Sequence, residues 1–236
     1  MSTSKDLIKD SIADHYDKYS AEYDQKNAVA QQIIIDCLAF QTIRPYATGK
    51  DVLEVGCGTG IWMQELQPVV KSISGIDLST GMVQQAKQKG LKAKKGDVEA
   101  LPFPDASFDL LYSYRVLPHV PNLPKALAEM ERVLRPEGKA ILMFYNRKSL
   151  KYLSRKKKME EKVFTAFYSI DEIIALHPSL KLIGGYKILP YPKRVSKIPG
   201  FDTAYTFMER VCSRTFLKRF GGNMLWEMSK HAEEKT

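Results

Sequence analysis

Three glycines stand within five positions, at Gly56, Gly58 and Gly60, directly after the mostly apolar segment 52–55. Because glycine lacks a Cβ atom, a turn built from it can aim backbone N–H groups at a ligand and let that ligand approach closely. Asp77 follows 21 residues after the first glycine, a spacing typical of a carboxylate that accepts hydrogen bonds from ribose hydroxyls. The combination predicts a site for a cofactor that contains a nucleoside.

The spacing of the glycines separates two classes of cofactor. The dinucleotide pattern is Gly-x-Gly-x-x-Gly, and its third glycine would fall at the position that Ile61 occupies. S-adenosylmethionine carries no phosphate, and its sulfonium favours nearby carboxylates and aromatic faces. Glu54, Asp77 and Asp97 supply carboxylates, and tyrosines near the N-terminus supply rings. The sequence therefore counts against NAD or FAD and favours S-adenosylmethionine.

The segments around these residues alternate between short strands and helices. The patterns predict strands near 51–56, 72–77, 91–95, 108–114 and 139–145, and helices over 28–43, 62–70, 80–89 and 122–134, the first of them closed by Pro45. This alternation predicts βαβ units and a doubly wound, mostly parallel α/β sheet. The glycine turn and Asp77 would meet at the carboxyl ends of its strands, where such sheets bind ligands.

The pattern changes after residue 146. It predicts a basic helical insertion over 147–162, helices over 169–177 and 202–217, and strands over 182–189 and 223–228. With 236 residues, the chain is long enough for one domain with a cap. We expect a single domain over 1–236, with a helical lid (1–44), a cofactor-binding core (45–146) and a substrate cap with the last strands (147–236).

The positive charge lies in the C-terminal part of the chain. Residues 1–146 carry 17 basic and 18 acidic side chains, whereas residues 147–236 carry 19 basic and 9 acidic ones. Such asymmetry indicates either an anionic partner or a solvated basic surface. The N-terminal residues show no secretory signal, no run reaches the roughly 18 apolar residues of a membrane helix, and the three cysteines lie far apart. We expect a cytoplasmic protein without disulfides or a metal site.

Four ordered blocks, at 52–60, 75–82, 96–109 and 133–138, resemble the class I S-adenosylmethionine-dependent methyltransferases, most closely the subgroup of ubiquinone and menaquinone biosynthesis. The segment 15–24 is similar to the family's N-terminal helix. The resemblance implies a Rossmann-like, doubly wound, seven-stranded sheet with an antiparallel last strand and a helical cap. It also implies S-adenosylmethionine as cofactor and S-adenosylhomocysteine as product.

The resemblance assigns roles to individual residues. The glycines would line the methionine end of the cofactor, Asp77 would hold the ribose, and Asp97 would accept from the adenine amino group. The expected cofactor contacts are Tyr16, Tyr23, Glu54, Gly56, Cys57, Gly58, Gly60, Asp77, Leu78, Met82, Asp97, Val98, Glu99 and Tyr114. Plain structural roles remain open for three of them: Glu54 as an acid that caps the turn, Cys57 as a small filler and Met82 as a core residue.

Methyl transfer from a sulfonium depends mainly on positioning the acceptor and excluding water. His119, after the fourth predicted strand, is the candidate base for an acceptor that must lose a proton, and the alternative is that it only orients its loop. We expect a small-molecule or lipid-like acceptor, modified on oxygen, nitrogen or carbon. The acceptor, the methylated atom and the oligomeric state stay open.

The basic segment 147–164 interleaves with apolar residues, so it could receive an anionic acceptor, lie on an anionic membrane, grip RNA or be a plain exposed helix. A nucleic-acid methyltransferase is the first alternative function. Neither Asn-Pro-Pro-Tyr nor Asp-Pro-Pro-Tyr follows the fourth strand, where residues 113–116 read Ser-Tyr-Arg-Val. The second alternative is a protein that binds the cofactor without catalysis.

Overall fold

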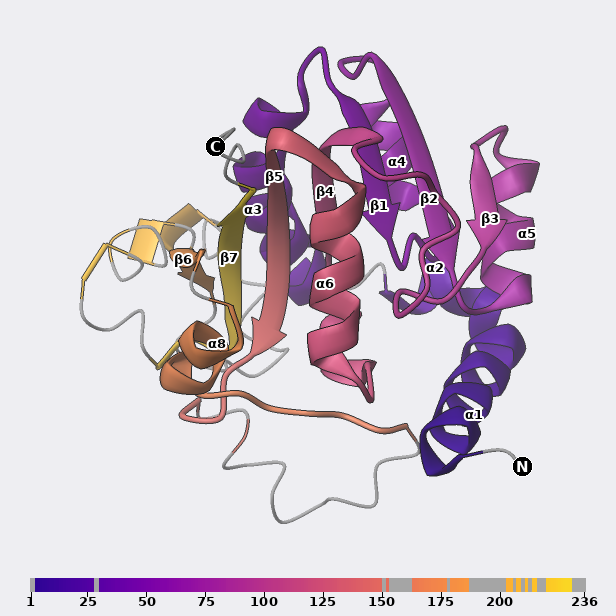
Figure 1. The fold of residues 1–236 in the computed structure, drawn as a ribbon. Helices are drawn as coiled ribbons and strands as arrows, with labels where there is room; N and C mark the ends of the chain where they lie inside the picture. The colour runs from indigo at the N-terminus through magenta and orange to yellow at the C-terminus, as the bar shows by residue number, and fades with distance from the viewer. Residues whose placement is uncertain are drawn as a thin grey trace, which may run out of the picture.

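The computed structural model describes residues 3–27, 30–149, 152, 163–177, 179–186, 203–205, 207–208, 211, 214–215 and 220–230. At its centre is a seven-stranded sheet with the order β3-β2-β1-β4-β5-β7-β6 (Figure 1). The strands are β1 (Asp51–Val55), β2 (Ser72–Asp77), β3 (Ala93–Lys95), β4 (Phe108–Ser113), β5 (Leu134–Tyr145), β6 (Leu180–Tyr186) and β7 (Asn223–Ser229). The first five are mutually parallel, and β7 runs antiparallel to both β5 and β6. The predicted sheet, with its antiparallel last strand, is confirmed.

Helices cover both faces of this sheet (Figure 1). The helices are α1 (Ser4–Tyr19), α2 (Tyr23–Asn27), α3 (Ala30–Ala47), α4 (Ile61–Leu66), α5 (Thr80–Gln88), α6 (Leu123–Val133) and α8 (Ile170–Leu176), with short 3₁₀ helices η1 (Ser20–Glu22) and η2 (Leu117–His119). Side chains of a strand alternate between faces, so β5 serves two cores. Leu142 and Phe144 pack with α6, whereas Ile141 and Met143 pack with α3 and α4.

The first difference from the sequence prediction concerns Pro45, which does not end its helix. Helix α3 continues to Ala47 with Pro45 inside it. Proline removes one backbone donor and usually breaks a helix interior, but here it lies in the last turn, where only that one bond is at stake. Ile43 and Ala47 on either side are fully buried, and their packing offsets the lost bond.

Two further boundaries differ for local reasons. Helix α4 ends at Leu66 rather than near residue 70, because Pro68 has no N–H with which to extend it. Strand β5 begins at Leu134 rather than near residue 139. Leu134 pairs with Phe108 and Lys139 pairs with Leu110, so the residues between form a bulge.

The C-terminal part is described only partially. The helix predicted over 169–177 corresponds to α8, which Ser169 caps through a capping box with Glu172. Strand β6 begins two residues earlier than expected, at Leu180. The predicted insertion over 147–162 and helix over 202–217 lie largely outside the described residues. None of the helices within the described residues is long and apolar enough to cross a membrane.

Candidate functional site

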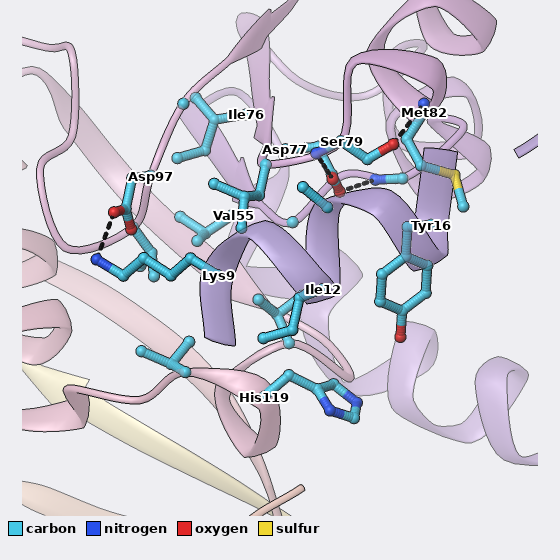
Figure 2. Close-up of a pocket in the computed structure, with 18 of the residues that line it drawn as sticks. Lys9, Ile12, Tyr16, Val55, Ile76, Asp77, Ser79, Met82, Asp97 and His119 are labelled. Atoms are coloured by element: carbon cyan, nitrogen blue, oxygen red, sulfur yellow. Dashed lines mark hydrogen bonds and ion pairs between the residues drawn. The ribbon is translucent and has the colours of Figure 1, made fainter. Parts of the chain in front are cut away.

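A cavity of about 820 Å³, a volume that includes its opening to solvent, lies at the carboxyl ends of the central strands. Its walls come from α1, the turn after β1, the end of β2, and the loops that follow β3 and β4. Figure 2 shows the lid helix α1 across the cavity from Val55 and Ile76. Its place is the one expected for a ligand site in a doubly wound sheet.

The turn after β1 uses its glycines for two separate purposes. Gly56, Gly58 and Gly60 all have positive φ, at 74°, 53° and 79°, a region that side chains with a Cβ rarely adopt. A Cβ on Gly56 would also lie 2.0 Å from Cγ2 of Val116. The loop after β4 therefore packs directly on the glycine turn, and no other residue type fits at Gly56 without displacement.

Asp77 ties the end of β2 to the glycine turn. The Gly58 N–H donates to Oδ2 at 2.8 Å, and the Ser79 N–H donates to Oδ1 at 2.9 Å. Burial raises the pKa of Asp77, and these backbone donors act against that rise. Each carboxylate oxygen keeps a further lone pair, so the fixed carboxylate can still accept hydrogen bonds from two hydroxyls.

Lys9 joins the lid to two carboxylates at the far end of the cavity. Its Nζ lies 2.7 Å from Oδ2 of Asp97 and 2.7 Å from Oε2 of Glu99 (Figure 2 shows the Asp97 pair). Burial acts to lower the pKa of Lys9, but the two carboxylates raise it. Glu99 also accepts from the Asn122 N–H at 3.0 Å, so the loop after β3 is linked to both the lid and α6.

Two more acids hold the N-terminal helices on the core. Asp17 accepts from the Ser79 hydroxyl and from the Gly81 N–H, and Asp24 accepts from the Thr59 hydroxyl. The residues of this lid that line the cavity are Lys9, Ile12, Ala13, Tyr16 and Tyr23. The lid is thus anchored at the adjoining loops while its apolar and aromatic side chains close the cavity.

Most of the residues expected from the sequence line this cavity. They are Tyr16, Tyr23, Gly56, Gly58, Asp77, Leu78, Met82, Asp97, Val98, Glu99, Tyr114 and His119. Glu54, Cys57 and Gly60 lie outside its lining. Cys57 is 5% exposed, and burial raises the pKa of its thiol, which suits a filler. Gly60 leaves room for Leu91, because a Cβ there would lie 2.3 Å from Cδ1 of that residue.

Sequence reasoning missed several cavity residues. Lys9 pairs with acids 88 and 90 positions away, and no local pattern signals such a pair. Arg115 has a left-handed backbone with φ of 64°, which a non-glycine sequence does not predict. Trp62 stacks on the cavity residue Tyr114 with ring centroids 4.2 Å apart. The apolar spacing in α4 gave no sign that Trp62 lies beside the site.

The hydrogen-bond partner of His119 determines which of its ring nitrogens carries the proton. Its Nδ1 lies 2.7 Å from the carbonyl oxygen of Phe164, and because a carbonyl only accepts, Nδ1 carries the proton in the neutral ring. Nε2 is then the basic nitrogen. The ring centroid lies 6.4 Å from that of Tyr16 and 6.3 Å from that of Tyr145. This arrangement suits a proton acceptor as well as an orienting group.

Glu54 is buried behind the turn, and its Oε2 has no hydrogen-bond partner among the described residues. Burial raises the pKa of Glu54 to about 8. The folded protein therefore keeps Glu54 protonated up to about pH 8, whereas the unfolded chain releases this proton near the ordinary pKa of 4.5. The free energy of unfolding falls as pH rises between these two values.

We expect Glu54→Gln to flatten that dependence. Because one pKa unit corresponds to about 1.4 kcal/mol, the free energy of unfolding of the parent should fall relative to the variant by more than about 1 kcal/mol between pH 5.5 and 8. Urea denaturation without cofactor at both values measures the difference. Parallel behaviour of the two proteins would show that Glu54 does not titrate in this range.

Comparison with known proteins gives consistent matches. Residues 53–142 match the model of the methyltransferase domain. A malonyl-acyl-carrier-protein O-methyltransferase of Serratia marcescens is 31% identical over 141 residues, covering 58% of this chain and 54% of that protein. An uncharacterized protein of Methanocaldococcus jannaschii is 29% identical over 228 residues, covering 89% of this chain and 86% of that protein.

A solved structure from Thermotoga maritima, described as an S-adenosylmethionine-dependent methyltransferase and possible histamine N-methyltransferase, is similar over 91% of this chain and 98% of its own. Its TM-score is 0.68 at 20% identity, which establishes the shared fold. The chain spans about half the length of the Serratia relative and of a second one from Erwinia billingiae, at 54% and 58%.

Within the described residues, no group of three or more His, Cys, Asp or Glu side chains could hold a metal ion.

Proposed function

We propose, on the premise that this chain contains a class I S-adenosylmethionine-dependent methyltransferase domain, that it transfers a methyl group to an oxygen, nitrogen or carbon of a small-molecule or lipid-like acceptor. The observation that carries the proposal is Asp77, which the Gly58 and Ser79 N–H groups hold beside the glycine turn in the cavity wall. S-adenosylmethionine is the cofactor of the family, and S-adenosylhomocysteine is the product.

The residues of the cavity fit this cofactor. Gly58 lines the cavity, and a Cβ there would meet nothing within 4 Å, so the turn leaves open space where the methionine end would approach its backbone. Asp77 would hold the ribose, and Asp97 would accept from the adenine amino group. When bound, the cofactor supplies a methyl group already activated on a positively charged sulfur. The chain would contribute binding, orientation and the exclusion of water.

The lid and His119 would complete the site. Tyr16 and Tyr23 close the cavity from α1 and α2, which keeps water from competing with the acceptor. For an acceptor that must lose a proton, His119 Nε2 would take it, with Nδ1 held by Phe164. A relative named for methylation of an acyl-carrier-linked malonyl group supports an acceptor of metabolite type. Contact of 147–164 with an anionic acceptor or membrane remains part of the proposal.

Calorimetry with S-adenosylhomocysteine tests the cofactor, and transfer of labelled methyl groups from S-adenosylmethionine to candidate acceptors tests the reaction. Binding together with transfer to a small molecule is expected. Binding without any transfer would favour a non-catalytic protein, and salt-dependent RNA binding with transfer to RNA would favour the nucleic-acid alternative. No binding at all would refute the proposal.

A further inference from the structure

The charges on the cavity wall are unevenly placed. Three carboxylates line it, and each already has partners: Asp97 and Glu99 hold Lys9, and Asp77 holds two backbone N–H groups. Figure 2 shows Tyr16 and His119 on the side away from the Asp97–Lys9 pair. Among the described residues, the other cation of the wall is Arg115.

Arg115 lines the same cavity as Tyr16 and Tyr23, and its positive charge affects the pKa of Tyr16. Burial and the neighbouring phenols of Tyr23 and Tyr145 raise the pKa of Tyr16, and the positive charge of Arg115 opposes that rise. Tyr16 and Tyr23 have ring centroids 6.5 Å apart. Two phenols and a guanidinium therefore share this part of the cavity, and Tyr16 stays protonated as a hydrogen-bond donor.

The backbone holds Arg115 at this place in an uncommon conformation. Its φ of 64° lies in the left-handed region, which is unfavourable for a residue with a long side chain. The next residue, Val116, occupies the space that the missing Cβ of Gly56 leaves. Strain of this kind persists where the surrounding structure enforces it, and it clusters at functional sites.

We propose that the methyl acceptor is a carboxylic acid, with its carboxylate against Arg115 and within reach of the Tyr16 and Tyr23 hydroxyls. This inference rests on the proposed methyl transfer and specifies its acceptor. The planar guanidinium matches a carboxylate in shape and charge, and phenols add neutral donors. An ammonium acceptor would instead meet a like charge at this position.

Methylation of a carboxylate needs no base, because the acceptor has no proton to lose. A lone pair of the carboxylate oxygen attacks the methyl carbon, the new O–C bond forms as the C–S bond breaks, and the electron pair of that bond stays on sulfur. The sulfonium and the carboxylate both lose their charge, leaving a methyl ester and a neutral thioether. No proton moves, so His119 would orient its loop rather than take a proton.

Three probes with one tail and different head groups test the proposal: hexanoate, hexanol and hexylamine. Each is titrated by calorimetry into protein saturated with S-adenosylhomocysteine, and each is offered as methyl acceptor with S-adenosylmethionine. A malonyl half-thioester of N-acetylcysteamine separates a thioester-linked acid from a free one. We expect at least one acid to bind about 10-fold or more tightly than the alcohol and the amine, with a rate that is flat from pH 6 to 9.

A variant of Arg115 separates the contribution of the guanidinium to acid binding from that of the loop conformation. Arg115→Asn keeps a residue type that tolerates the left-handed region, so the loop should persist. We expect it to weaken binding of the better acid by about 10- to 100-fold, the range for a hydrogen bond to a charged group, without changing the affinity for S-adenosylhomocysteine. Lys125→Asn, which removes an exposed cation on α6, is the matched control and should change neither.

The outcomes distinguish this inference from the proposed function. Binding of hexylamine as tight as that of the better acid, failure of both acids to bind, or unchanged acid binding in Arg115→Asn would each refute the carboxylate acceptor. The proposed methyltransferase would survive any of these if S-adenosylhomocysteine still bound. A parent protein that does not bind S-adenosylhomocysteine would refute both.

Discussion

Asp77→Ala should lower the affinity for S-adenosylhomocysteine by at least about 100-fold. The variant loses a carboxylate that would accept from two ribose hydroxyls, and each hydrogen bond to a charged group is worth roughly 1.5–3 kcal/mol. It also leaves the Gly58 and Ser79 N–H groups without the acceptor they have at 2.8 and 2.9 Å. The turn would then lose the bond from Gly58, while the Gly56 and Cys57 N–H groups would still donate to the Ile76 carbonyl oxygen. Calorimetry on parent and variant measures the effect.

A matched control removes a carboxylate that does not line the cavity. Asp105 is an exposed acid that pairs with Arg132, so Asp105→Ala should bind the cofactor product like the parent. Asp77→Asn keeps one acceptor oxygen and should fall between the parent and the alanine variant. Thermal unfolding of each variant without ligand shows whether the fold persists. Parent-like affinity of a folded Asp77→Ala would remove Asp77 from the proposed cofactor site.

Gly56→Ala should lower the free energy of unfolding by about 2–5 kcal/mol. Its φ of 74° costs an L-residue roughly 1–2 kcal/mol. The new Cβ would lie 2.0 Å from Cγ2 of Val116, and overpacking of this kind typically costs about 1–3 kcal/mol more. Urea denaturation measures the change, and the shifted turn should also weaken binding of S-adenosylhomocysteine.

Two further variants divide this loss into its parts. Gly49 has φ of 71°, and a Cβ there would meet nothing within 4 Å, so Gly49→Ala should show the backbone cost alone. Combining Gly56→Ala with Val116→Ala removes the methyl group that clashes and should recover part of the stability. If Gly49→Ala and Gly56→Ala cost the same, the close approach of the loop after β4 contributes nothing.

The features that sequence reasoning found share a local origin. The glycine turn and Asp77 lie at the ends of adjacent strands, and strand topology alone brings them together. Strand and helix periodicity likewise sufficed for the parallel core, because each element is defined by neighbours within one or two turns. The antiparallel last strand came from resemblance to a family, since a strand's direction leaves no mark in its own residues.

What sequence reasoning missed depends on distant contacts. Lys9 belongs to a polar helix in sequence and becomes part of the cavity only because Asp97 and Glu99 are folded against it. The conformation of Arg115 follows from the packing of Val116 on Gly56, which no single segment encodes. The same holds for Pro45, tolerated because burial of its neighbours outweighs its helix-breaking tendency.

The stacking of Trp62 on Tyr114 has an optical consequence. The chain contains two tryptophans, and the other, Trp226, is 1% exposed within the sheet. Trp62 is half-buried, and Tyr114, at the cavity wall, lies against it with an interplanar angle of 22°. A ligand that moves Tyr114 changes the surroundings of one indole and leaves the other as a constant background. Occupancy of the cavity should therefore be visible in the intrinsic fluorescence of the unlabelled protein.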